Sequence, residues 1–390
     1  MFKGFSLAHL SAGFVAVLVG YTSSAAIIFQ ATHTVGATEA QIASWMWALG
    51  IGMAVSSISL SLYYRIPLLT AWSTPGAALL VTSLAGVSLP EATAAFILCG
   101  ILITVIGYAG WFERLMHWIP VPLASAMLAG VLLKFGLSAF VSLQQQPLLV
   151  GCMFVTFLLM KRLLPRYAIP LTLIVGMLVA WFSGLMDLGK LSLKWAQPVF
   201  VMPEIRLEAL IGVGLPLFIV TMASQNIPGV AVLKANGYAA PLSKTIGFTG
   251  LTTMILAPFG GYAYNLAAIT AAICMGEDVD KDKSKSYLAS FSAGVFYLLA
   301  GLLGASITSL FLSFPPTLIL AIAGFALIST IANSLQVALI DSSEREAALI
   351  VFLVTASGIS LVGLGSAFWG LVLGLLARFW LVQKRAALIS

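Results

Sequence analysis

The stretch LLTAWSTPGAALL, residues 68–80, breaks an apolar run with residues that suit the start of a helix. Ser73 and Thr74 are good N-cap residues, and Pro75 is well suited to the first helical position. A helix that starts here directs unpaired N–H groups and its positive dipole end at whatever lies in front of it. The pattern, with Gly76 included, therefore predicts an anion-binding helix N-terminus. A simple proline kink or a tight packing point is the alternative.

A second stretch, PFGGYAYNLAAITA at residues 258–271, aligns with residues 67–80 at a shift of 191. Both stretches begin with proline, carry an aromatic residue near the break and resume as a short apolar helix. Asn265 is the expected polar cap of the second helix. If two such half-helices approach each other from opposite sides of a membrane, their N-termini form a site for a small anion without a dedicated Arg or Lys.

Polar residues interrupt two further apolar segments, which we expect beside the breaks. One is GYTSS at residues 20–24, and the other is TMASQNIPG at residues 221–229. Such residues either line a cavity or join helices through hydrogen bonds. The Pro-Gly pair favours the cavity for the second segment, whereas both readings stay open for the first. The candidate polar wall is Ser23, Ser224, Gln225 and Asn226.

Four aromatic residues gather at the same places: Tyr21, Trp72, Tyr262 and Tyr264. Trp and Tyr of membrane proteins usually belong to interfacial belts, and most of the other Trp residues fit that reading. Aromatic residues in the middle of a span, beside a helix break, are better suited to stacking and edge contacts with a flat apolar ligand. We therefore include these four in the candidate substrate site.

The acidic residues argue against several classes of protein. All thirteen Asp and Glu residues fall in predicted loops or at the ends of predicted spans. This disfavours a carboxylate proton relay and an intramembrane aspartyl protease. No HExxH or GxSxG motif stands out, so a membrane enzyme is a weak alternative. The three widely spaced cysteines show no metal-binding or disulfide pattern, and we expect no metal and no cofactor.

Lys134, in AGVLLKFGLSAF, is the one ionisable residue expected within the membrane. An intramembrane lysine is by default a functional candidate, because a desolvated lysine titrates easily and can balance the charge of an anion. The alternative is that its long side chain reaches the outer interface. Both readings stay open.

Composition indicates in what kind of protein these residues lie. The chain is 61% hydrophobic and 8% charged, which leaves too few polar side chains to cover a water-soluble globule of this size. We predict an all-α polytopic membrane protein. The fourteen predicted spans are residues 8–29, 41–63, 66–83, 92–111, 120–143, 147–162, 167–186, 208–233, 242–257, 260–275, 286–308, 315–334, 347–363 and 366–383.

Charge in the loops predicts the orientation. With the N-terminus and Lys3 in the cytoplasm, most Lys and Arg residues fall on the inner side, and the outer loops hold only Lys190, Lys194 and Arg206. By the positive-inside rule, both termini are therefore expected in the cytoplasm. We read the net charge of +6 as this topology signal and expect no nucleic-acid partner.

An internal repeat is visible when the first half of the chain is laid over the second at a shift of 194. Five glycines of the first half then meet glycines of the second: Gly100, Gly107, Gly110, Gly130 and Gly176. Two halves of seven spans each enter the membrane from opposite sides, because seven is odd. Such an inverted repeat is typical of secondary transporters.

Four motifs, GYTSSAAIIFQA, TAWSTPGAALL, LPLFIVTMASQNIPG and LVGLGSAFWG, resemble the benzoate/proton symporter family of bacterial inner membranes, and the resemblance covers essentially the whole chain. That family is similar in fold to uracil permease. The resemblance implies fourteen spans in two inverted repeats, with short broken spans three and ten and the substrate between them. It also implies a core domain from residues 1–111 and 205–308 and a gate domain from residues 112–190 and 309–390.

One departure from the related nucleobase carriers bears on the substrate. Those carriers have a substrate-binding glutamate in span eight and another in span ten, where this chain has Ser224-Gln225 and Tyr264. An acid would repel a carboxylate, so its absence fits an aromatic acid and disfavours a nucleobase. It also removes the obvious proton carrier.

We therefore expect a secondary transporter that imports an aromatic carboxylate such as benzoate together with a proton. A carrier or channel for another small monoanion is the main alternative, and a membrane enzyme or receptor that uses the same pocket is a weaker one. The expected partners are the substrate, the proton and the lipid bilayer, and a homodimer is left open.

Overall fold

The computed structural model describes residues 5–112, 114, 120–187, 189, 191–276, 279–362 and 364–389. Several charged residues used in the sequence arguments lie outside these ranges: Lys3, Glu113, Lys190, Glu277 and Asp278. Within the described residues, six helices are long and apolar enough to cross a membrane, or seven if one pair bent by 64° is counted as a single span. The polytopic, helical class expected from composition is thus confirmed.

The elements follow one another in two halves joined by a long connection. The first half contains α1 (Leu7–Thr34), α2 (Glu39–Tyr64), β1 (Thr70–Trp72), α3 (Thr74–Ser83), α4 (Leu89–Tyr108), α6 (Val121–Gln145), α7 (Pro147–Leu163), the 3-10 turn Pro165–Tyr167 and α8 (Ala168–Phe182).

The second half begins with an interrupted helix. It contains α9 (Leu207–Ala209), π-helical turns at Leu210–Gly214 and Met222–Asn226 on either side of α10 (Leu215–Thr221), α11 (Ile227–Ala235), α12 (Leu242–Leu256), the 3-10 turn Ala257–Phe259, β2 (Tyr264–Leu266), α13 (Ile269–Cys274), the 3-10 turn Lys283–Lys285, α14 (Tyr287–Leu302), α15 (Gly304–Leu312), α16 (Pro316–Leu339), α17 (Arg345–Ser357) and α18 (Ser366–Ile389).

The internal repeat reappears in the bounds of these elements. Adding 194 to the bounds of β1 gives 264 and 266, the bounds of β2, and adding 194 to the last residue of α7, Leu163, gives Ser357, the last residue of α17. The shift of 191 that aligned the two breaks in sequence is therefore three residues out of register. It matched Pro67 to Pro258, but Pro258 lies in a 3-10 turn, and a Gly-Gly pair adds length before β2.

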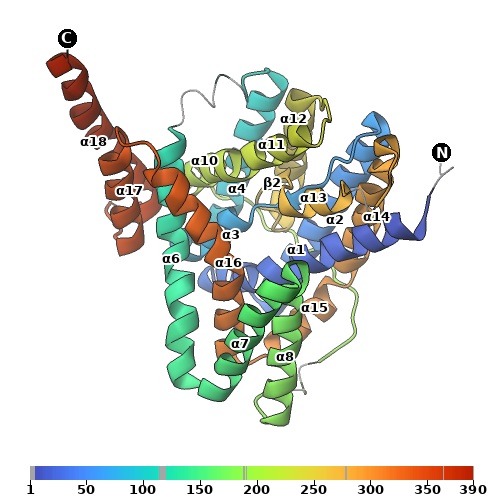
Figure 1. Cartoon of the computed structure of the whole chain (residues 1–390). Helices are drawn as coiled ribbons and strands as arrows, with labels where there is room; N and C mark the ends of the chain where they lie inside the picture. The colour runs from blue at the N-terminus through green and yellow to red at the C-terminus, as the bar shows by residue number, and fades with distance from the viewer. Residues whose placement is uncertain are drawn as a thin grey trace.

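The helices pack in two groups. In the first, called here the α2–α14 group, α2 packs on α14, α4 on α12, α1 on α14 and α13, and α15 on α2. In the second, the α6–α16 group, α6 packs on α16 and α17, α7 on α8, and α17 on α18. Figure 1 shows the second group on the left and below, the first on the right, and α1 crossing between them. Glycines allow the closest approaches: a Cβ on Gly107 would lie 2.5 Å from the Cα of Gly247.

One predicted span is shorter than expected. Residues 347–363 are helical only to Ser357, where α17 ends after 13 residues, about 20 Å at 1.5 Å per residue. Gly358 follows with a φ of 69°, and Leu361 and Leu364 bridge to close a turn before α18. A helix of that length falls short of a hydrocarbon core of about 30 Å. In Figure 1 the α17–α18 hairpin lies beside only part of α6.

Candidate substrate-binding site

Two three-residue strands bring the sequence breaks together. β1 and β2 pair antiparallel, with Thr70 opposite Leu266, Ala71 opposite Asn265 and Trp72 opposite Tyr264. Bonds beyond the strands extend the pair, because Ser73 N–H donates to Ala263 O at 3.0 Å and Ala267 N–H donates to Leu69 O at 2.9 Å. The pairing satisfies backbone groups that would otherwise be unpaired where the helices break. Two stretches from different halves of the chain thus form one structural unit.

The first break is closed by Ser73, which is the N-cap of α3. Its side chain accepts a hydrogen bond from Gly76 N–H at 3.0 Å, and Pro75 lies in the first turn. Thr221 in α10 donates to the Ser73 hydroxyl at 3.1 Å, and the Tyr262 hydroxyl donates to the Ser73 carbonyl at 3.1 Å. Side chains of α10 and of the segment before β2 therefore fix the position of the α3 N-terminus.

Two neighbours of the cap have different surroundings. Gly76 is buried, and a Cβ there would lie 2.7 Å from Leu217 of α10, so glycine permits this close contact. Thr74 is the first residue of α3 and keeps part of its surface exposed. Of Ser73, Thr74 and Gly76, only Thr74 keeps part of its surface exposed.

The second break is built differently, and one expectation from sequence is wrong. Asn265 does not cap the second half-helix, because it lies in the middle of β2, and the N-cap of α13 is Ala268, which makes no side-chain cap bond. The Asn265 side chain is fully buried. Its amide nitrogen donates to Leu266 O at 2.9 Å, and its Oδ1 atom has no partner among the described residues. α13 has 6 residues, and its first, Ile269, is 75% exposed.

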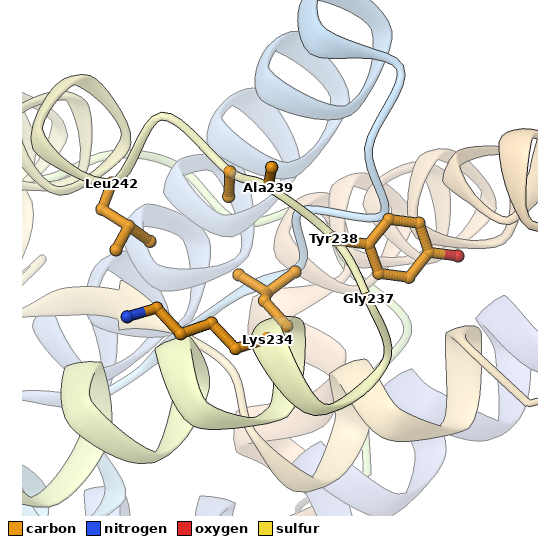
Figure 2. A pocket seen from close by; sticks show the side chains of 7 residues that line it. Lys234, Gly237, Tyr238, Ala239 and Leu242 are labelled. Carbon is orange, nitrogen blue, oxygen red and sulfur yellow. The ribbon is translucent and has the colours of Figure 1, made fainter.

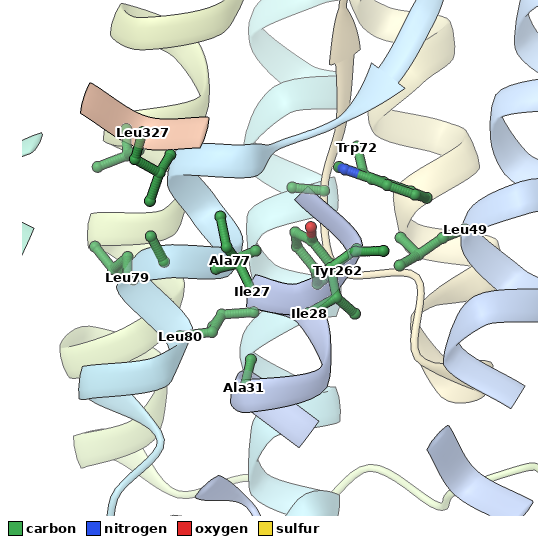
Figure 3. Packing of buried hydrophobic residues seen from close by; sticks show 14 of the residues in the cluster. Ile27, Ile28, Ala31, Leu49, Trp72, Ala77, Leu79, Leu80, Tyr262 and Leu327 are labelled. Atoms are coloured by element: carbon green, nitrogen blue, oxygen red, sulfur yellow. The ribbon is translucent and has the colours of Figure 1, made fainter. Parts of the chain in front are cut away.

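The four aromatic residues separate into two kinds. Tyr21 and Trp72 meet edge to face with ring centroids 4.6 Å apart, and Trp72 Nε1 donates to the Ser24 hydroxyl at 2.7 Å. Tyr21 keeps part of its surface exposed, whereas Trp72 is buried and 3% exposed. Tyr262 and Tyr264 are fully buried, and the Tyr264 hydroxyl donates to Ala48 O in α2 at 2.6 Å. Figure 3 shows Trp72 and Tyr262 among packed apolar side chains of α1, α2 and α3.

The polar wall predicted from the eighth span contains a π-helical turn. Ser224 and Gln225 are half-buried in this turn, whereas Asn226 is fully buried. The Asn226 Oδ1 atom accepts from Leu266 N–H at 3.0 Å, so this side chain holds β2 in place. π-helical turns are rare and occur frequently at functional sites. In α1, Ser23 is half-buried and donates to Gly20 O at 3.1 Å.

Lys134 lies apart from the breaks. It is exposed on α6, and its Nζ atom lies 2.5 Å from the position that a Cβ on Gly358 would take, just past the C-terminus of α17. The C-terminal end of a helix carries partial negative charge, so a cation there is stabilising.

Some structural roles at the breaks went unnoticed in the sequence. Thr253 of α12 accepts from Tyr264 N–H at 3.0 Å, and Ser57 of α2 accepts from Thr70 N–H at 3.0 Å. Thr221 bonds to Ser73 across 148 residues of sequence. The hydroxyl residues of α2 and α12 carried a weak signal, since Ser and Thr within apolar spans commonly bond to irregular backbone.

The α11–α12 turn holds a pocket of about 330 Å³ that contains none of the predicted site residues. Figure 2 shows Lys234 and Leu242 facing each other across it. Its lining is Leu233, Lys234, Gly237, Tyr238, Ala239, Ala240 and Leu242.

Comparison with known proteins shows which family the chain resembles. The profile of the benzoate membrane transport protein family (BenE) matches residues 3–380. The inner membrane protein YdcO of Escherichia coli (strain K12) is 52% identical over 365 residues, which cover 94% of this chain and 93% of that protein. The benzoate membrane transport protein of Acinetobacter baylyi is 40% identical over 385 residues, which cover 99% of this chain and 98% of that protein.

A solved structure supports the fold independently of these relatives. The transmembrane domain of a cyanobacterial bicarbonate transporter, BicA, is similar with a TM-score of 0.61 and 12% identity, covering 96% of this chain and 98% of that one. At this identity the similarity shows the fold alone. The family resemblance read from the four motifs is confirmed by the relatives, and the chain belongs to the benzoate membrane transport protein family of multi-pass inner-membrane transporters, not of enzymes.

Proposed function

We propose that this protein imports an aromatic carboxylate of the benzoate type together with a proton, with the substrate held between β1–α3 and β2–α13. The observation that carries the proposal is the pairing of the two breaks into one unit that ends at a capped, dipole-bearing helix N-terminus. The names of the family and of the Acinetobacter relative support benzoate as the substrate class.

The carboxylate of the substrate would meet backbone N–H groups. Within the described residues, the N–H groups of Thr74, Ile269 and Thr270 have no hydrogen-bond acceptor. These are groups at helix N-termini, where anions are stabilised by both the free donors and the dipole. The larger contribution would come from α3, because its ten residues give a longer aligned dipole than the six of α13.

The ring of the substrate would lie against Tyr21, which keeps part of its surface exposed, and Trp72, which is 3% exposed, would support Tyr21 through their edge-to-face contact. Ser23, Ser224 and Gln225, which are half-buried, would complete the polar wall. The buried residues of the predicted set would support the site from behind. Ser73 and Gly76 shape the cap, Asn226 bonds to β2, Asn265 lies within β2, and Tyr262 and Tyr264 anchor the strands.

Alternating access would arise from movement between the two packing groups. The α2–α14 group matches the proposed core domain, residues 1–111 and 205–308, except that its helix α15 runs on to Leu312. The α6–α16 group is made of elements from residues 112–190 and 309–390, the proposed gate domain. The same proposal includes fourteen membrane crossings, some of them by short helices, and cytoplasmic termini.

The proton has no acidic carrier at the breaks. Ser224, Gln225 and Tyr264 occupy the places where the nucleobase carriers have glutamates. Lys134 remains our candidate for charge coupling, although its ammonium faces the end of α17 and not the breaks.

Uptake of labelled benzoate into proteoliposomes, with and without an inward proton gradient, tests the proposal. We expect uptake that the gradient stimulates. Absence of uptake in both conditions would refute benzoate as the substrate, and uptake indifferent to the gradient would refute proton coupling while leaving transport intact. Competition by small non-aromatic monoanions at equal concentration would favour the broader anion carrier, because helix N–H groups alone do not select for a ring.

A further inference from the structure

An extended segment connects the two halves of the chain on the face opposite the predicted cytoplasmic loops. Residues 191–204, called here the strap, run between α8 and α9 without helix or strand. The first part of the strap is bound to α15. Ser192 N–H donates to the Ser309 hydroxyl at 3.2 Å, Lys194 N–H donates to the Ser306 hydroxyl at 3.0 Å, and both hydroxyls return a bond to the strap carbonyls at 3.0 Å.

The second part of the strap is bound to four further elements. Ala196 N–H donates to Leu302 O of α14 at 2.9 Å, and Val199 N–H donates to the Ser44 hydroxyl of α2 at 2.9 Å. Val201 N–H donates to Pro258 O at 2.8 Å, and Glu204 N–H donates to Pro90 O of α4 at 3.0 Å. Every acceptor belongs to the α2–α14 group or to the turn between α12 and β2. The strap is therefore bound along its length to one packing group.

The sequence of the strap explains this one-sided attachment. In an extended chain, alternate side chains point to opposite faces. Ala196 is buried against the helices, whereas Leu193 and Trp195 point away and are 88% and 67% exposed. On α15, Ser306 and Ser309 lie three residues apart and so face the strap together. The exposed apolar residues suit the interfacial zone of the outer leaflet, where Trp is favoured.

The chain passes from one packing group to the other within two residues. Leu185 N–H still bonds to Ala180 O of α8, whereas Asp187 N–H donates to Ser313 O at the end of α15, at 3.0 Å. Met186 lies between them. Ser313 is in turn followed by Phe314 and Pro315, which lead into α16 of the other group. The two connections between the groups on this face thus cross side by side and are joined by the Asp187–Ser313 bond.

We infer that the strap and α15 move as part of the α2–α14 group, and that the two groups pivot on this face at a single hinge formed by Met186 and Phe314. The inference rests on the proposed alternating access, because the hinge is the place where the backbone would bend when the two groups move. Gly184, with a φ of 67° and open space around it, ends α8 just before the hinge.

Distances between spin labels test the hinge. One nitroxide is placed on the strap with Leu193→Cys, and the second is placed either on α2 with Val55→Cys or on α6 with Leu137→Cys. All three positions are exposed. The protein is reconstituted in lipid, and double electron–electron resonance is recorded with and without benzoate. Labelled wild type measures any reaction of the native cysteines, and uptake of benzoate is measured for both double variants.

We expect the strap–α2 distance distribution to stay the same and the strap–α6 distribution to change in mean or in width when benzoate is added. A changed strap–α2 distribution would overturn the inference, as would two unchanged distributions in variants that still take up benzoate. Absence of uptake in wild type would instead refute the proposed function, so the two failures are distinguishable.

Discussion

The two helix breaks share a paired strand but differ at the helix start that follows it, in backbone conformation and in side-chain chemistry. β1 and β2 occupy equivalent places in the repeat and pair with each other, yet only the α3 break has a side-chain cap, from Ser73. The α13 break starts at Ala268, has 6 residues in its helix and exposes Ile269. The comparison teaches that the repeat retains the strand pairing that satisfies the broken backbone, while the one side-chain cap lies on α3, where we propose that the anion binds. The predictions below test this asymmetry, beginning with the largest expected effect.

Asn265→Asp should abolish benzoate uptake, while Asn265→Ala should retain part of it. Asn265 is fully buried with one oxygen unpaired, so an aspartate that is ionised there places a negative charge without a partner beside the proposed anion site. Binding is measured by calorimetry and folding by size-exclusion chromatography in detergent. Wild-type affinity in a folded aspartate variant would exclude this break from the site.

Ser73→Ala should lower the free energy of unfolding by more than a substitution at Ala268, the N-cap position of α13, changes it. Loss of an N-cap costs about 1 kcal/mol, or roughly a fivefold change in an equilibrium constant. Ala268→Ser should change stability by less than about 0.5 kcal/mol, because Ala268 has an αR backbone and not the extended conformation of a cap residue. The thermal unfolding midpoints of both variants are compared with that of wild type. Equal shifts would show that the two helix starts do not differ in the contribution of their caps.

Trp72→Phe and Tyr264→Phe remove one hydrogen bond each from residues that face each other in the strand register. Each loss should cost about 0.5–1.5 kcal/mol of stability. We expect only Trp72→Phe to raise the KM for uptake as well, because Tyr21 beside it is partly exposed whereas Tyr264 is enclosed by α2. A raised KM in the Tyr264 variant alone would place the ring of the substrate at the other strand.

The smallest expected effect concerns Lys134, which lies outside both breaks. As a coupling residue it should make the pH dependence of uptake differ between Lys134→Met and wild type, while Lys134→Arg keeps the cation and the profile. The ammonium also faces the α17 C-terminus, where a cation contributes about 0.3–1 kcal/mol. If both variants keep the wild-type pH profile and only Lys134→Met is less stable, Lys134 stabilises the C-terminus of α17 and does not take part in proton coupling.

The sequence by itself determined the class of the protein and the places where its helices break. Low charge and high apolar content leave a membrane as the only suitable solvent, and Ser73 with Pro75 two residues later is typical of a helix start. The glycine pattern likewise revealed the repeat, because close helix packing depends on residue size, which sequence records directly.

Only the tertiary structure decided how the second break is built. The sequence predicted Asn265 as a helix cap and Tyr264 as a contact for the substrate ring. Strand pairing places Asn265 within β2, and the Tyr264 hydroxyl bonds to α2. The π-helical turn at Met222–Asn226 and the bond from Asn226 to β2 left no periodic signal. A hydrogen bond between residues far apart in the chain depends on the register of two elements, and local propensity does not encode that register. Sequence therefore located the breaks, whereas packing decided which of their side chains keep some exposed surface and which are buried and hold the strands.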